Sequence, residues 1–81
     1  MRVQVKLFAA ARELAGTDIV DVDLPSEASF GDLRTKLIST HPQLSPVGGS
    51  SIFAADARYV SDGESIPETA EIALIPPVSG G

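Results

Sequence analysis

Cysteine and tryptophan are absent from this 81-residue chain, and histidine occurs once, as His41. Without cysteine the chain has no disulfide, thiolate zinc site, iron–sulfur cluster or cysteine nucleophile. A single histidine also excludes a histidine metal cluster, and His41 stands directly before a proline, where a surface or capping role is expected. The sequence therefore predicts no metal site and no internal catalytic centre.

Basic residues are scarce as well. Six Lys and Arg stand against eleven Asp and Glu, and the formal net charge is −5. Binding to nucleic acid requires clustered basic side chains, so we exclude that class of function. The acidic surface is compatible with a partner that presents basic groups, or it simply keeps the protein soluble.

Long apolar runs are missing too, and none approaches the ~20 residues of a membrane span. The first ten residues, "MRVQVKLFAA", alternate between apolar and polar, which is not the pattern of a signal peptide. The apolar fraction of 43% and the charged fraction of 21% are typical of a soluble globular domain. We expect one cytoplasmic domain without a membrane partner.

The first half of the chain predicts a hairpin and a helix. Residues 2–8 and 18–24 alternate with period two, as half-buried strands do, and Gly16 closes a short helical turn or loop between them. After Pro25 the period changes, and an amphipathic helix with Ser29 as its N-cap is expected to end before Pro42. Its apolar stripe consists of Phe30, Leu33, Leu37 and Ile38.

The second half predicts a loop at residues 45–51 and then short strands at residues 51–55, 58–60 and 70–75. The last strand is apolar on both faces, which indicates a central strand or a face kept for a partner. This order predicts an α+β fold of the ubiquitin-like β-grasp type, a mixed sheet of four to five strands with one main crossover helix.

The chain ends on "PPVSGG", residues 76–81, which we separate as an extended functional tail from a domain at residues 1–75. Pro76 and Pro77 hold the first part extended, and the six residues reach about 20 Å at ~3.3 Å each. Gly80 and Gly81 carry no Cβ, so their backbone can enter a slot too narrow for other residues. A partner enzyme could join the terminal carboxylate to AMP, and a sulfur nucleophile could then displace the AMP.

Three stretches of this sequence resemble the small subunit of molybdopterin synthase, the MoaD family of sulfur carriers. They are "LFAAARELAG" at residues 7–16, the helix leading to "HPQL", and above all "EIALIPPVSGG" at residues 71–81. The similarity spans the whole chain and implies the β-grasp fold. It also implies a subunit that is not catalytic alone but works within a sulfurtransferase complex.

The resemblance implies two protein partners. An E1-like adenylyltransferase would activate Gly81 with ATP and Mg²⁺, and Gly81 would then become a thiocarboxylate. The large synthase subunit, in a heterotetramer, would receive the tail and pass its sulfur to cyclic pyranopterin monophosphate, making molybdopterin. The carrier itself would bind no cofactor.

The resemblance implies site residues at the positions of this sequence that match the family. Gly81 would carry AMP and then sulfur, Gly80 would give the slender approach, and the other positions would contact partners: Phe8, Arg12, Tyr59, Ile75, Pro76, Pro77, Val78 and Ser79. For Phe8, Tyr59 and Ile75 packing in the core is the alternative. Asp56 stands where many members of the family carry Asn, which bears on a polar contact with a partner.

Three alternatives remain open at this point. The chain could carry sulfur for thiazole or for tRNA thiolation, since such carriers share the fold and the Gly-Gly end. It could be a ubiquitin-like protein modifier, because an amine can capture the same adenylate. It could also be a plain interaction domain whose tail is incidental.

Overall fold

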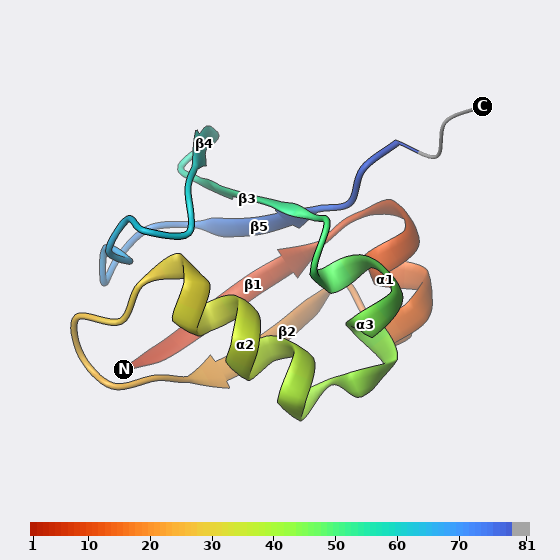
Figure 1. Ribbon diagram of the computed structural model, residues 1–81, viewed down its shortest axis with the longest axis horizontal. Coiled ribbons are helices and arrows are strands. Elements are labelled where there is room, and N and C mark those ends of the chain that lie inside the picture. Colours follow the sequence, from red (N-terminus) through yellow and green to blue (C-terminus); the bar gives the residue numbers. More distant parts are fainter. Residues whose placement is uncertain (79–81) are drawn as a thin grey trace.

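Five strands form one mixed sheet in the computed structural model, which describes residues 1–78, and the helices pack against one face of that sheet (Figure 1). The elements in chain order are β1 (Arg2–Leu7), α1 (Ala9–Ala15), β2 (Ile19–Asp23), α2 (Phe30–Thr40), the 3₁₀ turn η1 (Pro42–Leu44), α3 (Ser45–Gly48), β3 (Ile52–Ala55), β4 (Arg58–Val60) and β5 (Ile72–Ile75).

The strand order is β2-β1-β5-β3-β4. β1 pairs antiparallel with β2 and parallel with β5, while β3 pairs antiparallel with both β5 and β4. A parallel pair needs a crossover, and the segment that holds α2 supplies it. This arrangement is the ubiquitin-like β-grasp, so the predicted fold class is confirmed, and β5 is central as its apolar faces indicated.

The core lies between the sheet and α2. Alternate residues of β1 and β2 point to it, and Phe30, Leu33 and Leu37 of α2 are almost completely buried. The rings of Phe30 and Phe53 lie 5.7 Å apart, in a tilted arrangement favourable for aromatic pairs. Each large side chain buried here contributes roughly 1.5–3 kcal/mol. Ile38, the fourth residue of the predicted stripe, is only half-buried.

Helix α2 begins and ends where the sequence predicts. The Ser29 hydroxyl accepts from the Asp32 backbone N–H, and the Asp32 carboxylate accepts from the Ser29 N–H, which forms a capping box. His41 is the C-cap residue, half-buried, directly before Pro42. The structure therefore gives this histidine the capping position expected for it.

The predicted loop at residues 45–51 is wrong in its first half. The chain forms η1 and then α3 before it reaches β3. Pro42 and Pro46 stand in the first turns of these short helices, where a proline fits because its φ is already helical and its missing N–H would have no partner. Leu44 between them is fully buried, which fixes the segment against the core.

Arg34 on α2 joins this segment to a distant turn. Its guanidinium donates to the backbone oxygens of Gly48 (2.6 Å) and Ser51 (2.7 Å) and makes a two-bond ion pair with the Asp62 carboxylate at 3.0 and 2.8 Å. It also lies 5.0 Å from the centre of the Phe53 ring. The Arg34 side chain is only 17% exposed, so these contacts satisfy a charge that would otherwise be costly to bury.

Candidate functional site: an open sheet face and a tail

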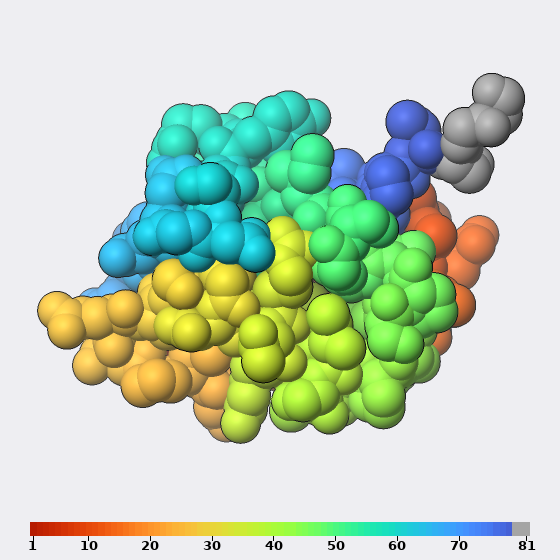
Figure 2. Space-filling model, viewed as in Figure 1, coloured from red at the N-terminus to blue at the C-terminus, as the bar shows by residue number. Residues whose placement is uncertain are grey.

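The tail leaves from the centre of the sheet. β5 lies between β1 and β3 and continues directly into Pro76, which is buried, and then into Pro77 and Val78, which are exposed. Proline has no N–H for the ladder, so pairing stops at Ile75. The Val78 side chain is 94% exposed, and Figure 2 shows the end of the described chain projecting from the body. The chain thus presents Pro77 and Val78 to solvent.

The second face of the sheet has no helix on it within residues 1–78. Strand pairing places Tyr59 beside Ala54, Ala54 beside Ala73, and Ala73 beside Lys6, with Ile19 after Lys6. Ile52 and Ile75 form the neighbouring row, and Phe8 extends it beyond the end of β1. We call the apolar members of these rows the docking face: Phe8, Ile19, Ile52, Tyr59 and Ile75.

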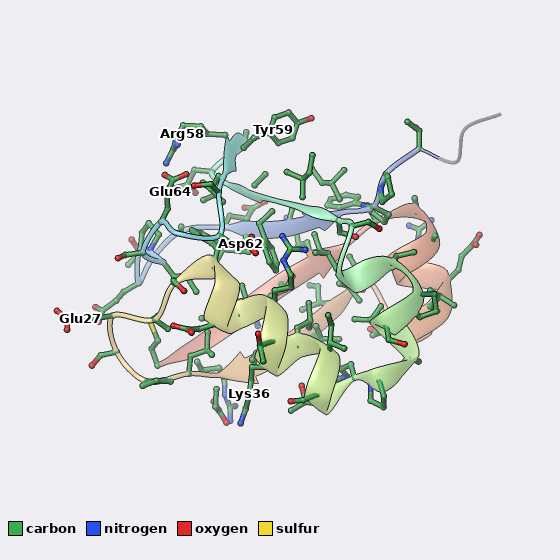
Figure 3. All side chains as sticks on the ribbon, viewed as in Figure 1. Glu27, Lys36, Arg58, Tyr59, Asp62 and Glu64 are labelled. Carbon is green, nitrogen blue, oxygen red and sulfur yellow. The ribbon has the colours of Figure 1, made fainter. Side chains whose placement is uncertain are left out.

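Most of the docking face is open to solvent. Phe8 is 46% exposed, Ile52 49% and Tyr59 68%, and Ile75 is half-buried. Figure 3 shows the Tyr59 ring pointing away from the body on β4. Neighbouring exposed apolar side chains of this kind mark contact surfaces, and tyrosine suits a contact with a wet edge. The predicted residues Phe8, Tyr59 and Ile75 therefore lie on one face of the sheet and outside the buried core.

The sequence reasoning missed two members of this face, Ile19 and Ile52. Both break the alternation of their strands, because they stand at outward positions where a polar residue is usual. In β2 the other outward residues are Asp21 and Asp23. An apolar residue at a strand position that faces solvent was thus the signal that could have identified Ile19 and Ile52.

Phe8 reaches the docking face through a tight turn. Its backbone is extended, and Ala9 follows with φ 51°, a left-handed conformation that costs an alanine roughly 1–2 kcal/mol. The Phe8 carbonyl oxygen accepts from the N–H groups of Ala11 and Arg12, which starts α1. Gly16, with φ 73°, ends α1 at the left-handed position predicted for it.

Arg12 stands at the edge of the docking face. It lines a pocket of about 240 Å³ with Lys6, Leu7, Phe8, Asp18 and Ile19. The chain's other basic side chains, apart from Lys36, are paired with acids: Arg2–Asp23, Lys6–Glu71, Arg34–Asp62 and Arg58–Glu64. Arg12 takes part in no ion pair among residues 1–78.

Tyr59 is positioned by the hairpin of β3 and β4. Asp56 and Ala57 at its tip both have positive φ, 49° and 66°, as a two-residue type I′ turn requires. Glu71 joins this tip to the start of β5 and also holds Lys6 through an ion pair of 2.7 Å. These contacts fix the hairpin tip, and with it Tyr59, relative to β5 and β1.

None of the carboxyl groups with shifted pKa values belongs to a member of the docking face. A hydrogen bond from Arg34 lowers the pKa of Asp62, and one from Arg2 lowers the pKa of Asp23. The backbone N–H of Ser61 is the main cause of the lowered pKa of Glu64. In the described part of the chain no three acids or histidines gather as metal ligands, and no helix there is long and apolar enough to cross a membrane.

The tail residues divide at the limit of the described chain. Pro76, Pro77 and Val78 form the exit from the sheet, whereas the predicted residues Ser79, Gly80 and Gly81 lie outside the described residues. Their roles, and that of Arg12 in a partner contact, stay predictions.

Comparisons with known proteins agree with this geometry. The model of the ThiS family matches residues 5–81. The molybdopterin synthase sulfur carrier subunit of Chlamydomonas reinhardtii is 37% identical, and the match covers 100% of both chains. The crystal structure of SAMP1 from Haloferax volcanii superposes with a TM-score of 0.85 at 35% identity over 100% of both chains. Subunit 1 or 2 in a complex of the molybdopterin-converting factor from Helicobacter pylori shares the fold, with a TM-score of 0.70 at 20% identity and 100% of both chains covered.

Proposed function

We propose that this chain, which belongs to the ThiS family, is the sulfur carrier subunit of a molybdopterin synthase. The relative in Chlamydomonas reinhardtii bears that name and matches from end to end. The observation that carries the proposal is the continuity of docking face and tail. Ile75 belongs to the docking face, and the next three residues lead off the sheet.

The proposed chemistry takes place on Gly81. Its carboxylate attacks the α-phosphorus of ATP on an E1-like adenylyltransferase that uses Mg²⁺, and pyrophosphate leaves. A sulfur nucleophile then displaces AMP and leaves a thiocarboxylate. These proposed steps assign no metal site and no base to residues 1–78. The chain contributes the acyl group of a terminal glycine, carried on a segment that begins with two prolines. Docking of the domain would hold this group at high effective concentration in the partner's site.

The large synthase subunit is the proposed partner for sulfur transfer. A solved complex of the two subunits of a molybdopterin-converting factor supports a partner of this kind. The docking face would bind it, Arg12 would pair with one of its acids, and Pro76 to Ser79 would line its entrance. The sulfur would pass to cyclic pyranopterin monophosphate, and water would return the tail to a carboxylate. We propose the heterotetramer and the cytoplasmic location together with this role.

A second candidate function rests on the similarity to SAMP1. A curated relative from Haloferax volcanii named small archaeal modifier protein 1 is 35% identical and is matched over 97% of its length. A modifier would use the same adenylate and give its acyl group to an amine on a target protein. A carrier for thiazole or for tRNA thiolation would share the sulfur step and differ only in the acceptor.

Intact-mass measurement on protein purified from its own cells tests the proposal. Sulfur in place of oxygen adds about 16 Da to the peptide that ends at Gly81, which is the expected result. Adducts of the tail on lysines of other proteins favour the modifier. Reconstitution with the large subunit and cyclic pyranopterin monophosphate then tests the product. A loaded carrier that forms no molybdopterin in that assay contradicts the synthase role.

A further inference from the structure

One charged side chain stands among the apolar residues of the docking face. Lys6 occupies an outward position of β1, with Ile19 beside it on β2 and Ala73 beside it on β5. Lys6, Phe8 and Ile19 also line the same pocket of about 240 Å³. A partner that covers Phe8 and Ile19 therefore covers the Lys6 side chain as well. An ammonium that is covered without a counter-charge is costly.

Glu71 supplies the counter-charge from within the chain. Its carboxylate, directly before β5, accepts a hydrogen bond from Lys6 Nζ at 2.7 Å. Lys6 and Glu71 both line a larger hollow of about 350 Å³, and no member of the docking face belongs to that hollow. Glu71 does not line the smaller pocket that holds Phe8 and Ile19. The ion pair therefore directs the Lys6 ammonium toward the larger hollow and away from those two residues.

This ion pair is separate from the contacts by which Glu71 supports the fold. The bonds between Glu71 and Asp56 use the backbone N–H and carbonyl oxygen of Glu71 and leave its carboxylate free for Lys6. The side chains of Lys6 and Glu71 are 45% and 67% exposed, and ion pairs exposed to this extent contribute little to stability. The carboxylate can thus be removed while the hairpin tip keeps its backbone bonds.

We propose that the Glu71 side chain is a positioning group for docking, which holds the Lys6 ammonium away from Phe8 and Ile19 so that the partner meets an apolar face. The inference rests on the proposed function and adds a statement about the partner's chemistry. The partner presents an uncharged surface opposite Lys6, because the ammonium already has its counter-charge. Loss of the carboxylate leaves a single cation under the docked partner, and a charge left unpaired in this way weakens binding.

Titration calorimetry of the full chain with the large synthase subunit tests this role. Glu71→Ala should weaken binding at least fivefold, with a midpoint of thermal unfolding within about 4 °C of the original. Lys6→Met keeps an unbranched side chain without the ammonium and should bind within threefold of the original. The double variant K6M/E71A should also bind within threefold, because it leaves no charge to cover.

Glu68→Ala is the matched control. Glu68 lines the same larger hollow as Glu71 and takes part in no ion pair among residues 1–78. Its replacement changes the net charge by the same amount, and we expect an affinity within twofold of the original. An effect equal to that of Glu71→Ala would assign the loss to net charge and overturn the proposal.

The double variant decides between positioning and a purely structural role. If it binds as weakly as Glu71→Ala, removal of the ammonium does not rescue docking, and the proposal is wrong. A loss smaller than fivefold with Glu71→Ala also overturns it. So does a loss of more than threefold with Lys6→Met alone, because the partner would then be supplying an acid to the ammonium.

A measurement on the free chain separates this inference from the proposed function. Carbon-13 relaxation should show a more mobile Lys6 Cε in Glu71→Ala and an unchanged one in Glu68→Ala. Equal mobility in the original chain and in Glu71→Ala overturns the positioning role, whether or not the large subunit binds. An original chain that does not bind the large subunit contradicts the proposed function instead.

Discussion

Asp56 and Glu71 exchange two hydrogen bonds: the Asp56 N–H donates to the Glu71 carbonyl oxygen at 2.9 Å, and the Glu71 N–H donates to Asp56 Oδ1 at 3.0 Å. They tie the hairpin tip, and with it Tyr59, to the start of β5. Asp56 is the position where many members of the resembled family carry Asn, and the Asn side chain also offers an Oδ1. The departure is therefore compatible with this contact inside the chain.

Asp56→Ala should lower the free energy of unfolding by about 1–2 kcal/mol. The change leaves the Glu71 N–H without its acceptor and puts alanine at a positive φ, which Asp and Asn tolerate better. Asp56→Asn is the matched variant and should stay within about 0.5 kcal/mol of the original chain, because Oδ1 remains. Urea unfolding at pH 7 measures both. Equal losses in the two variants would show that the side-chain bond has no role.

Ala57→Gly should stabilise the protein by about 1 kcal/mol. Ala57 has φ 66°, a conformation that glycine adopts without the clash of a Cβ. In a domain of this size the midpoint of thermal unfolding should rise by roughly 4–8 °C per kcal/mol. Ala10→Gly in α1 is the control, because glycine in a helix costs about 0.5–1 kcal/mol. Opposite signs for the same substitution are the expected result.

Local pattern was enough to predict much of the fold. Alternation located β1 and β2, and the pair Ser29 and Asp32 located the start of α2, because these signals depend on neighbours in sequence. The face of Tyr59 was not fixed by such signals. It depends on the register between β4 and β3, which the two positive-φ residues at the hairpin tip set.

The features that sequence reasoning missed depend on distant contacts. Arg34 reads as a solvated helix residue, yet two backbone oxygens and the Asp62 carboxylate surround it. The turns at residues 42–48 were predicted only as the end of a helix and a loop, since their stability comes from Leu44 under α1 and α2. The burial of Pro76 likewise depends on the strands beside it.

Acid should destabilise the protein through Asp62, Asp23 and Glu64. Their pKa values are lower in the folded chain than in the unfolded chain, so the unfolded chain binds more protons in acid. The contribution of these groups is present above the unfolded pKa of about 4 and is lost as pH falls below it. Asp62→Asn should lower stability at pH 7 and make the fall between pH 5 and pH 2 shallower. Urea unfolding at several pH values measures this, and an unchanged slope contradicts it.

Tyr59→Ala should weaken binding to the large subunit at least tenfold. Tyr59 is 68% exposed and is not part of the hydrophobic core. Removing its ring should therefore lower the affinity for the partner and leave the fold intact. Leu14→Ala is the control, because Leu14 is 41% exposed on α1 and outside the docking face. Titration calorimetry with the large subunit measures binding, and thermal unfolding checks both variants. A similar effect of the two substitutions would remove the docking face from the proposal.

One residue added after Gly81 should abolish sulfur transfer and leave docking nearly unchanged. Docking is proposed to use the face of the sheet, which an added residue does not alter. Adenylation is proposed to need the carboxylate of a terminal glycine at a fixed distance from the docked domain, and an added residue displaces that carboxylate. Deletion of Gly80 and Gly81 should have the same effect, since the carboxylate would then stand two residues short, about 7 Å. Both losses follow from position and not from stability.

Replacing Gly80 with alanine separates the effect of tail length from the effect of side-chain size near the C-terminus. The variant keeps the same number of residues and the terminal glycine carboxylate, so binding of the domain should persist, but a Cβ would now have to enter the narrow channel that we propose for the partner. We expect the rate of adenylation or of sulfur transfer to fall at least tenfold, with an affinity for the large subunit within threefold. Single-turnover transfer from loaded carrier measures the rate. The alternative outcome is that Gly80→Ala transfers sulfur at the full rate while the chain with one added residue transfers none. In that case only the position of the carboxylate matters, and the absence of a Cβ at residue 80 has no role.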